Sequence, residues 1–272
     1  MKNPNDFEFS FKGYSVHPLN LNLTQEYVGL LKNSFAKFSP TVEYLEWLYR
    51  NNPRGNAVGF DAFDGTKLIA HYACIPIKLD GYSKNTLLSL NTATDPNYQG
   101  RGLFVQLAKQ TFEFYGEDFS NVVGVANSKS TGGFLKHLGF SGMGNLELRY
   151  GDLNRDQIGS KIYTEQELDW RISCPSKPLS ARRLGSNMVL VESKFVTLGP
   201  SLKSIVFIKS EDNSHRQRKT VGLTLDWRRG NIPSLKLPEK FKPSPLNLIF
   251  KPLQDLELDV LSSFSFPDFD AF

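Results

Sequence analysis

A strand, a glycine-containing turn and a helix follow one another between residues 87 and 112, and this order constrains the fold more than any other segment. The run 87–94 reads as a strand, and Pro96 disfavours a helix before it and favours an extended Asp95. After Gly102 the spacing of the apolar residues becomes that of a helix. One helical face is formed by Leu103, Leu107 and Thr111, and Phe104, Ala108 and Phe112 lie beside it. A glycine turn that opens a helix exposes backbone N–H groups at the positive end of the helix dipole. The segment therefore predicts a cradle for an anion such as phosphate, and an ordinary strand-to-helix connection is the alternative.

Two common phosphate-binding motifs do not match this turn. No Gly-Lys-Ser/Thr ending is present, which argues against a P-loop nucleotidase. Val105 stands where the third glycine of a G-x-G-x-x-G dinucleotide motif would be needed.

The segment Gln99-Gly-Arg-Gly102, after Asp95-Pro96, resembles the acyl-CoA-binding motif Q/R-x-x-G-x-G/A of the GNAT superfamily of N-acyltransferases. Further along, residues 121–126 read as a strand, and Asn127 opens a loop. Residues 134–140 then resemble the helix of the family that ends in Gly-Phe, with Gly139 suited to a left-handed helix end. The resemblance covers about residues 7–150, and the ordered set is more specific than either motif alone.

The resemblance implies a mixed α/β (α+β) fold with a GNAT-type central sheet, mixed and mostly antiparallel, flanked by helices. It also implies an acyl-CoA donor, with acetyl-CoA expected, bound without a metal. The backbone around Thr92, Ala93 and Thr94 would polarise the thioester, and Asn127 would bond the pantetheine arm unless it serves as a turn or N-cap residue. The pyrophosphate would meet Gln99, Gly100, Arg101, Gly102, Leu103 and Phe104.

Two residues depart from the family pattern. Phe104 stands where the family has a last small residue, so an aromatic ring could narrow the turn or approach the pantetheine arm. Leu135 takes the place of the Tyr that often protonates the departing thiolate, so that general acid cannot be carried over.

The residues on the acceptor side have both catalytic and structural interpretations. His71 lies in a predicted strand beside the site and is the candidate catalytic base, although a packed histidine or a water chain would also fit. Trp47 and Tyr49 are candidates for the acceptor pocket, and core packing is the alternative.

Whole-chain properties exclude several classes of function. The chain has 272 residues, a formal net charge of +4, and two cysteines, Cys74 and Cys174, which we expect to be reduced. The four histidines show no metal-ligand spacing with the cysteines, and the mild charge does not predict nucleic-acid binding. No apolar signal region or membrane-spanning run is apparent, so we expect a cytoplasmic protein. The basic run 215–219 is expected to be an exposed loop.

The sequence predicts two parts, residues 1–150 as an acyl-CoA-binding GNAT-like domain and residues 151–272 as a β-rich part. The segment Leu168–Pro175 echoes Leu45–Pro53, since both carry a Trp in a short helix followed by a Pro. We therefore expect the second part to be a degenerate GNAT repeat or an acceptor-binding region, and chance similarity is the alternative. The aromatic tail 264–272 is expected to pack as a last strand or against the substrate cleft.

The sequence as a whole predicts an acyl-CoA-dependent N-acyltransferase, with acetyl-CoA as donor and a primary amine of a small molecule, for example an amino sugar, as acceptor. A GNAT-like module that binds CoA or a nucleotide without catalysis is the second hypothesis. A transferase that uses aminoacyl-tRNA is the third, and the modest charge argues against it. The sequence does not define the oligomeric state.

Overall fold

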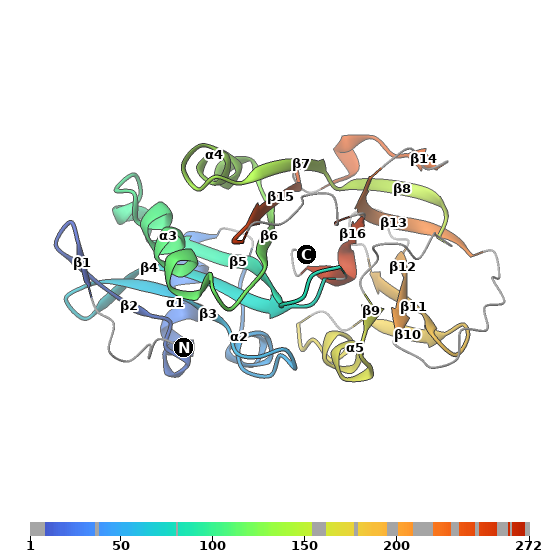
Figure 1. The fold of residues 1–272 in the computed structure, drawn as a ribbon, viewed down its shortest axis with the longest axis horizontal. Helices are drawn as coiled ribbons and strands as arrows, with labels where there is room; N and C mark the ends of the chain where they lie inside the picture. The colour runs from blue at the N-terminus through green and yellow to red at the C-terminus, as the bar shows by residue number, and fades with distance from the viewer. Residues whose placement is uncertain are drawn as a thin grey trace.

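The structure is a computed structural model that describes residues 9–35, 38–79, 81–153, 162–176, 179–194, 201–208, 220–229, 234–242, 245–254, 261 and 263–269. These residues form two mixed β-sheets that lie side by side, with helices packed on them (Figure 1). No helix in the described part of the chain is long and apolar enough to cross a membrane.

The first sheet, called sheet A here, has eight strands in the order β1-β2-β3-β4-β5-β6-β15-β7. Only β5 and β6 run parallel, and the other neighbours are antiparallel. The strand bounds are β1 Phe9–Phe11, β2 Tyr14–Pro18, β3 Val58–Asp64, β4 Lys67–Ile77, β5 Thr86–Thr94, β6 Asn121–Ala126, β7 Ser141–Asn145 and β15 Asn247–Pro252. The strands β3 and β4 form a hairpin around Gly65, and the predicted strand 121–126 is confirmed.

Four helices cover the two faces of sheet A. The helices α1 (Thr24–Ser34) and α2 (Val42–Tyr49) share one hydrophobic core with both sheets. The helices α3 (Leu103–Tyr115) and α4 (Ser128–His137) share a second core with the opposite face of sheet A. The predicted apolar stripe of α3 is buried, and Thr41 is the N-cap of α2, because its side chain accepts from Tyr44 N.

The second sheet, sheet B, also has eight strands, in the order β10-β11-β12-β13-β8-β14, with β16 paired to β13 and β9 paired to β12. The bounds are β8 Glu147–Asp152, β9 Ile162–Tyr163, β10 Ser180–Arg183, β11 Met188–Lys194, β12 Ser201–Ile208, β13 Val221–Arg228, β14 Leu235–Lys236 and β16 Ser263–Ser265. Helix α5 spans Glu165–Ile172, and the short 3-10 helices are η2 Leu21–Leu23, η3 Pro96–Tyr98, η4 Glu239–Phe241 and η6 Phe266–Asp268.

Sheet B repeats the plan of sheet A. In each sheet an antiparallel run ends in a parallel pair, β5 with β6 in sheet A and β12 with β13 in sheet B, and in sheet B the short β9 is also parallel to β12. The strand beyond that pair comes from the other half of the chain in both cases, since β15 lies between β6 and β7, and β8 lies between β13 and β14. This reciprocal exchange supports the expected second GNAT-like copy. The division predicted at residue 150 falls within β8 and stays a prediction.

The echo between the two Trp-containing helices is a physical contact. The rings of Trp47 in α2 and Trp170 in α5 stack with centroids 4.7 Å apart. Trp47 Nε1 donates to Trp170 O at 2.8 Å, and Trp170 Nε1 donates to Trp47 O at 2.9 Å. Thr164 caps α5 as Thr41 caps α2, at the same spacing from the tryptophan. The two helices therefore meet around a local pseudo-twofold relation, which is consistent with a second GNAT-like copy.

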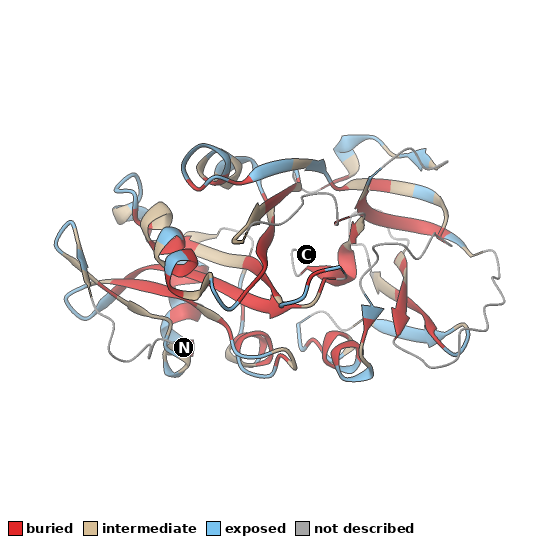
Figure 2. Cartoon of the chain, in the orientation of Figure 1, coloured by how far each residue is buried: buried red, intermediate tan, exposed pale blue. Residues whose placement is uncertain are grey.

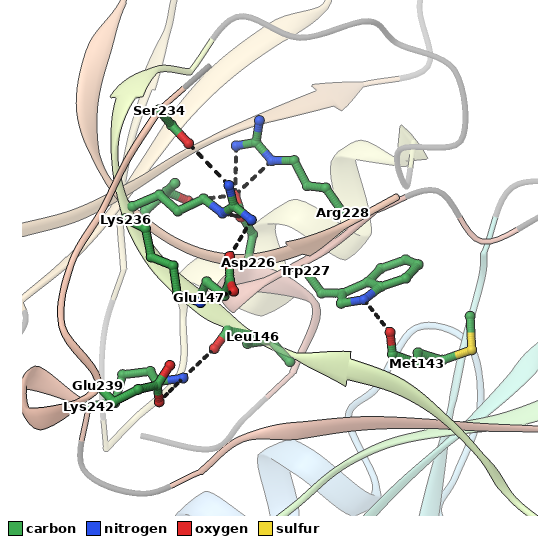
Figure 3. Close-up of polar contacts among 12 residues, drawn as sticks. Met143, Leu146, Glu147, Asp226, Trp227, Arg228, Ser234, Lys236, Glu239 and Lys242 are labelled. Atoms are coloured by element: carbon green, nitrogen blue, oxygen red, sulfur yellow. Dashed lines mark hydrogen bonds and ion pairs between the residues drawn. The ribbon is translucent and has the colours of Figure 1, made fainter. Parts of the chain in front are cut away.

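A polar cluster holds β8, β13 and β14 together at one end of sheet B (Figure 3). Asp226 is fully buried and accepts from Arg228 Nε at 3.0 Å and Nη2 at 2.7 Å. Arg149 donates to Ser234 Oγ at 3.2 Å and also pairs with Glu147. Buried carboxylates are stable only when paired in this way, so this end of β13 is fixed.

The sheets are also joined by side chains that bridge them. Trp227 Nε1 on β13 donates to Met143 O on β7 at 2.7 Å (Figure 3). Figure 2 shows buried residues along both sheets and on α2 and α5, consistent with one hydrophobic core that runs through both halves. The aromatic tail packs as predicted at its start, because β16 pairs with β13 and Phe264 stacks on Phe269. The basic run 215–219 lies outside the described residues.

Candidate functional site

The parallel strands β5 and β6 diverge, and this divergence defines the candidate site. Their register runs from Leu87 opposite Val122 to Ser89 opposite Gly124 and then stops, although β5 continues to Thr94. The edge of β5 that faces β6 beyond Ser89 is therefore a run of backbone N–H and C=O groups that an extended ligand can pair with. Among the described residues, no strand fills this gap.

The equivalent gap of sheet B is filled by the chain itself. Strands β12 and β13 share a single register pair, Leu202 with Leu223. Beyond that pair, β16 lies on β13, and β9 lies on β12. In the part of the chain that the structure describes, only sheet A thus offers an open divergence, in agreement with the absence of a second glycine motif from the sequence.

The glycine turn lies at the end of β5 and places the N-terminus of α3 at the gap. Gly100 and Gly102 have φ of +75° and +83°, in the left-handed region that favours glycine. Gly102 is the N-cap and provides no side-chain cap, and the first helical bond runs from Gln106 N to Gly102 O at 3.1 Å. Leu103, Phe104 and Val105 therefore present N–H groups that have no partner within the helix. Val105 was not among the predicted site residues, because only its backbone takes part.

The two polar side chains of the motif, Gln99 and Arg101, are held by neighbouring groups, and Gln99 Nε2 donates to Thr94 O at 3.3 Å. Arg101 lies over the Tyr98 ring at 4.8 Å and donates to Asn97 O at 3.0 Å, and it also bonds Tyr14. Lys12 Nζ donates to Arg101 O at 3.0 Å, which brings a second positive charge to the turn. The turn is thus rigid and electropositive, which suits an anion.

Phe104 and Leu135 both differ from the family pattern, and the structure places each of them. The Phe104 ring packs on α4, with its centroid 4.9 Å from that of Phe134, and a Cβ on Gly133 would lie 2.6 Å from its Cε1. The aromatic side chain is therefore accommodated by a glycine of the neighbouring helix. Leu135 is 39% exposed and has no proton to donate.

Asn127 lies at the end of β6 and serves as the N-cap of α4. Its Oδ1 accepts from Lys129 N and Ser130 N, both at 3.0 Å. The capping interpretation of this residue is therefore confirmed by the structure. Asn247 of β15 reaches the same place and donates to Thr131 Oγ1 at 2.8 Å.

A β-bulge interrupts β5 at the gap. His71 pairs with Ala93 and Ala73 with Leu90, so that two residues of β5, Asn91 and Thr92, lie opposite one residue of β4. Asn91 has φ of +49°, an uncommon conformation for a residue other than glycine. The predicted thioester-binding backbone, Thr92 to Thr94, starts at this bulge.

A chain of buried polar side chains ends at the same bulge. His71 Nδ1 lies 2.6 Å from Asp61 Oδ1, and His71 Nε2 lies 2.9 Å from Tyr49 Oη. Asn91 Nδ2 donates to Tyr49 Oη at 3.2 Å. Tyr27 donates to Asp61 Oδ2 at 2.5 Å and stacks on the His71 ring. His71 and Asp61 have no exposed surface, whereas Asn91 is half-buried.

The environment keeps both phenols of this chain protonated. Burial raises the pKa of Tyr49 well above its usual range, and Asp61 adds to the rise while the hydrogen bond from Asn91 opposes it. Burial also raises the pKa of Tyr27, followed in effect by the Asp61 carboxylate.

His71 and Tyr49 are site residues predicted from the sequence, whereas Asp61, Tyr27 and Asn91 were not expected there. Asp61 lies between Phe60 and Ala62 in an otherwise apolar strand, and a carboxylate at such a position needs a buried partner. That signal could have been noticed, but the identity of the partners required the fold.

Trp47 has a different environment from Tyr49. Its ring is stacked on Trp170 and its N–H group is used, so its observed contacts join the two halves of the chain. A contribution of Trp47 to an acceptor pocket stays a prediction. The described residues contain no group of three or more His, Cys, Asp or Glu side chains that could hold a metal ion.

Comparisons with known proteins agree with the architecture. No protein-family model matches the sequence, and a search of curated proteins finds no match. A solved structure from Enterococcus faecalis V583, described as a probable N-acyltransferase, aligns with 88% of this chain and 73% of its own at a TM-score of 0.58 and 10% identity. A solved structure from Pyrococcus horikoshii, described as a candidate acetyltransferase, aligns with 93% of this chain and 94% of its own at a TM-score of 0.55 and 10% identity. The GNAT-type fold predicted from the sequence is thereby confirmed, and the coverage of the chain is consistent with a second GNAT-like copy.

Proposed function

We propose that the protein binds an acyl-CoA, with acetyl-CoA as the expected donor, and transfers the acyl group to a primary amine of a small acceptor. The observation that carries the proposal is the open divergence of β5 and β6 beside a glycine turn at the start of α3. An extended amide-bearing arm and a pyrophosphate are the two parts of CoA, and the gap and the turn offer one complementary surface to each.

The binding roles follow from the geometry. The N–H groups from Gly102 to Val105 would accept the pyrophosphate, and the positive charges of Lys12 and Arg101 would add attraction. The pantetheine amides would pair with the free edge of β5 and approach Asn127. The thioester would then lie at the bulge, where the backbone from Thr92 to Thr94 could polarise its carbonyl.

Most of the catalytic effect in such a reaction comes from positioning the two reactants next to each other. Holding the amine and the thioester carbonyl together can supply about 7–11 kcal/mol of the barrier. The bulge faces the side of sheet A covered by α1 and α2, because Asn91 bonds Tyr49 of α2, and we place the acceptor there. An amino sugar is one acceptor of the right class.

A calorimetric titration with acetyl-CoA tests the binding step. We expect saturable binding by the wild type and its loss in Gly102→Glu, which would put a carboxylate at the proposed pyrophosphate position. Gly81→Glu is the matched control, because Gly81 has the same φ of +83°, is exposed, and lies before the opposite end of β5. Equal affinity in all three proteins would contradict the proposal.

A non-catalytic CoA-binding module is the second candidate, and Leu135 favours it because the usual thiolate acid is missing there. Release of CoA thiol from acetyl-CoA in the presence of primary amines separates the two. Binding without any accelerated thiol release would favour the module.

A further inference from the structure

The buried polar chain has an arrangement that packing alone does not require. It connects a carboxylate deep in sheet A, through an imidazole and a phenol, to the bulge at the β5–β6 gap. Asp61 belongs to β3, His71 to β4, Tyr49 to α2 and Asn91 to β5, so four separate elements place one linear chain of hydrogen bonds. Its inner end is buried, and its outer end is the half-buried Asn91.

The hydrogen-bond partners assign a direction to this chain. One oxygen of Asp61 accepts a hydrogen bond from Tyr27, and the other lies 2.6 Å from His71 Nδ1. These contacts fit an ionised Asp61 that accepts a hydrogen bond from a protonated Nδ1. His71 Nε2 is then a lone-pair acceptor for the Tyr49 proton, while Asn91 donates to the same phenol oxygen. Tyr49 therefore has its proton directed inward to His71, while on the side of the gap its oxygen accepts from Asn91.

We propose that Tyr49 is the catalytic residue that carries the proton during acyl transfer, and that His71, Asp61 and Tyr27 are positioning residues that hold and receive this proton. The proposal rests on the proposed acyl transfer at the β5–β6 gap and deepens it. The acceptor class that it implies is a neutral primary amine that reaches Tyr49 Oη from the side of α1 and α2.

In the proposed reaction one proton moves from the amine nitrogen to the leaving sulfur. The amine nitrogen attacks the thioester carbon, an N–C bond forms, and the nitrogen loses one proton to Tyr49 Oη while the Tyr49 proton passes to His71 Nε2. The resulting imidazolium is paired with the Asp61 carboxylate, which remains ionised. The C–S bond then breaks, and the proton returns from His71 through Tyr49 to the leaving sulfur. The products are the amide and the CoA thiol, and the side chains recover their starting states.

This relay accounts for two features together. Leu135 cannot protonate the thiolate, and a relay that takes a proton from nitrogen and gives it to sulfur makes a separate acid unnecessary. The bulge at Asn91 brings an amide group to the phenol oxygen at the start of the open edge.

Steady-state kinetics of Tyr49→Phe test the proposal. The substitution removes one hydroxyl and keeps the ring, so the fold should persist. Tyr163→Phe is the matched control, because Tyr163 is equally buried, donates to Asp268 at 2.7 Å and lies on β9 of sheet B. His71→Gln is the second variant, since it keeps a polar side chain but removes the imidazole that receives the proton. Thermal melts by circular dichroism show whether each variant is folded.

The assay is thiol release from acetyl-CoA with ethanolamine, glucosamine, spermidine or free lysine as acceptor, beside calorimetric binding of acetyl-CoA. We expect Tyr49→Phe to lower kcat by about 10²–10⁴-fold. Its KM and calorimetric affinity for acetyl-CoA should change by less than about twofold, because the hydroxyl acts in the transition state. His71→Gln should lower kcat in the same way, and Tyr163→Phe should leave it unchanged.

The outcomes separate the relay from the function. If the wild type does not bind acetyl-CoA, the proposed function fails. If it binds and turns over but Tyr49→Phe and His71→Gln keep kcat within about threefold, the relay is overturned and the function stands. If it binds acetyl-CoA and accelerates release with none of the amines, the relay is overturned in favour of the non-catalytic module.

Discussion

Replacing each tryptophan of the Trp47–Trp170 pair by phenylalanine should give unequal losses of stability, although the two residues are related by pseudo-symmetry. Both substitutions remove the same atoms and leave a stacked aromatic ring. Both also remove one N–H donor that bonds a carbonyl of the other helix. The shared losses cancel in the comparison, so the difference depends on the two carbonyls that remain and on Arg171, which lies 4.7 Å from the Trp170 ring and 5.9 Å from the Trp47 ring.

The two carbonyls differ in their other partners. Trp170 O also accepts from Ser173 Oγ at 2.9 Å, so it keeps a hydrogen bond in Trp47→Phe. Trp47 O is near the end of α2, and the following N–H groups of Arg50 and Asn51 both go to Glu46 O instead. In Trp170→Phe the buried Trp47 carbonyl therefore loses its donor. Leaving a buried acceptor unpaired costs about 1–3 kcal/mol, against about 0.5–1.5 kcal/mol for the loss of a hydrogen bond whose acceptor stays satisfied.

We therefore expect Trp170→Phe to lower the free energy of unfolding by about 1 kcal/mol more than Trp47→Phe does. Urea unfolding followed by far-ultraviolet circular dichroism measures it, because tryptophan fluorescence is itself changed by the substitutions. Adding Ser173→Ala to Trp47→Phe should remove most of the difference. Equal losses, or a larger loss in Trp47→Phe, would refute the reasoning from the carbonyl partners.

Two further predictions concern α4 and the start of the glycine turn. Gly132→Ala should stabilise the protein by about 0.5–1 kcal/mol, because alanine favours a helix and the position is open. Gly133→Ala should lose that gain or destabilise the protein, because its Cβ would lie 2.6 Å from the Phe104 ring. Thermal melts of the two variants compare them, and equal shifts of the melting temperature would contradict the packing of Phe104 on Gly133. The hydrogen bond from Lys67 lowers the pKa of the Asp95 carboxyl, and the hydrogen bond from Asn97 N adds to this effect. The ionised Asp95 therefore stabilises the fold at pH values above its unfolded pKa of about 3.9. This stabilisation is lost as the pH falls through the lower pKa of the folded state. The stability difference between the wild type and Asp95→Asn should thus be constant at neutral pH and shrink below about pH 4. Urea titrations at several pH values measure this difference, and a difference that stays the same at every pH would contradict the prediction.

The local elements of sheet A could be predicted because they are specified by nearby residues. Thr41 caps α2, Pro96 and Gly102 separate β5 from α3, and Gly139 ends α4 with φ of +69°. Each of these signals acts within a few residues, through backbone conformation or one hydrogen bond. The same holds for the glycine turn as a candidate anion site.

The exchange of strands could not be predicted in this way. Residues 246–250 read as a strand, but nothing in their alternation says that they pair with β6 and β7, far away in the sequence. The buried chain of Asp61, His71 and Tyr49 has the same origin, because its members come from separate elements. Contacts of this kind depend on topology, which composition and period do not encode.

A structure of the protein with CoA tests the central claim most directly. We predict that the pyrophosphate lies within hydrogen-bond reach, about 3 Å, of the N–H groups from Gly102 to Val105, with the pantetheine arm along β5 between Leu90 and Thr94 and the sulfur near Asn91 and Tyr49. CoA bound on sheet B, or bound to sheet A with its pyrophosphate away from the start of α3, would contradict the account.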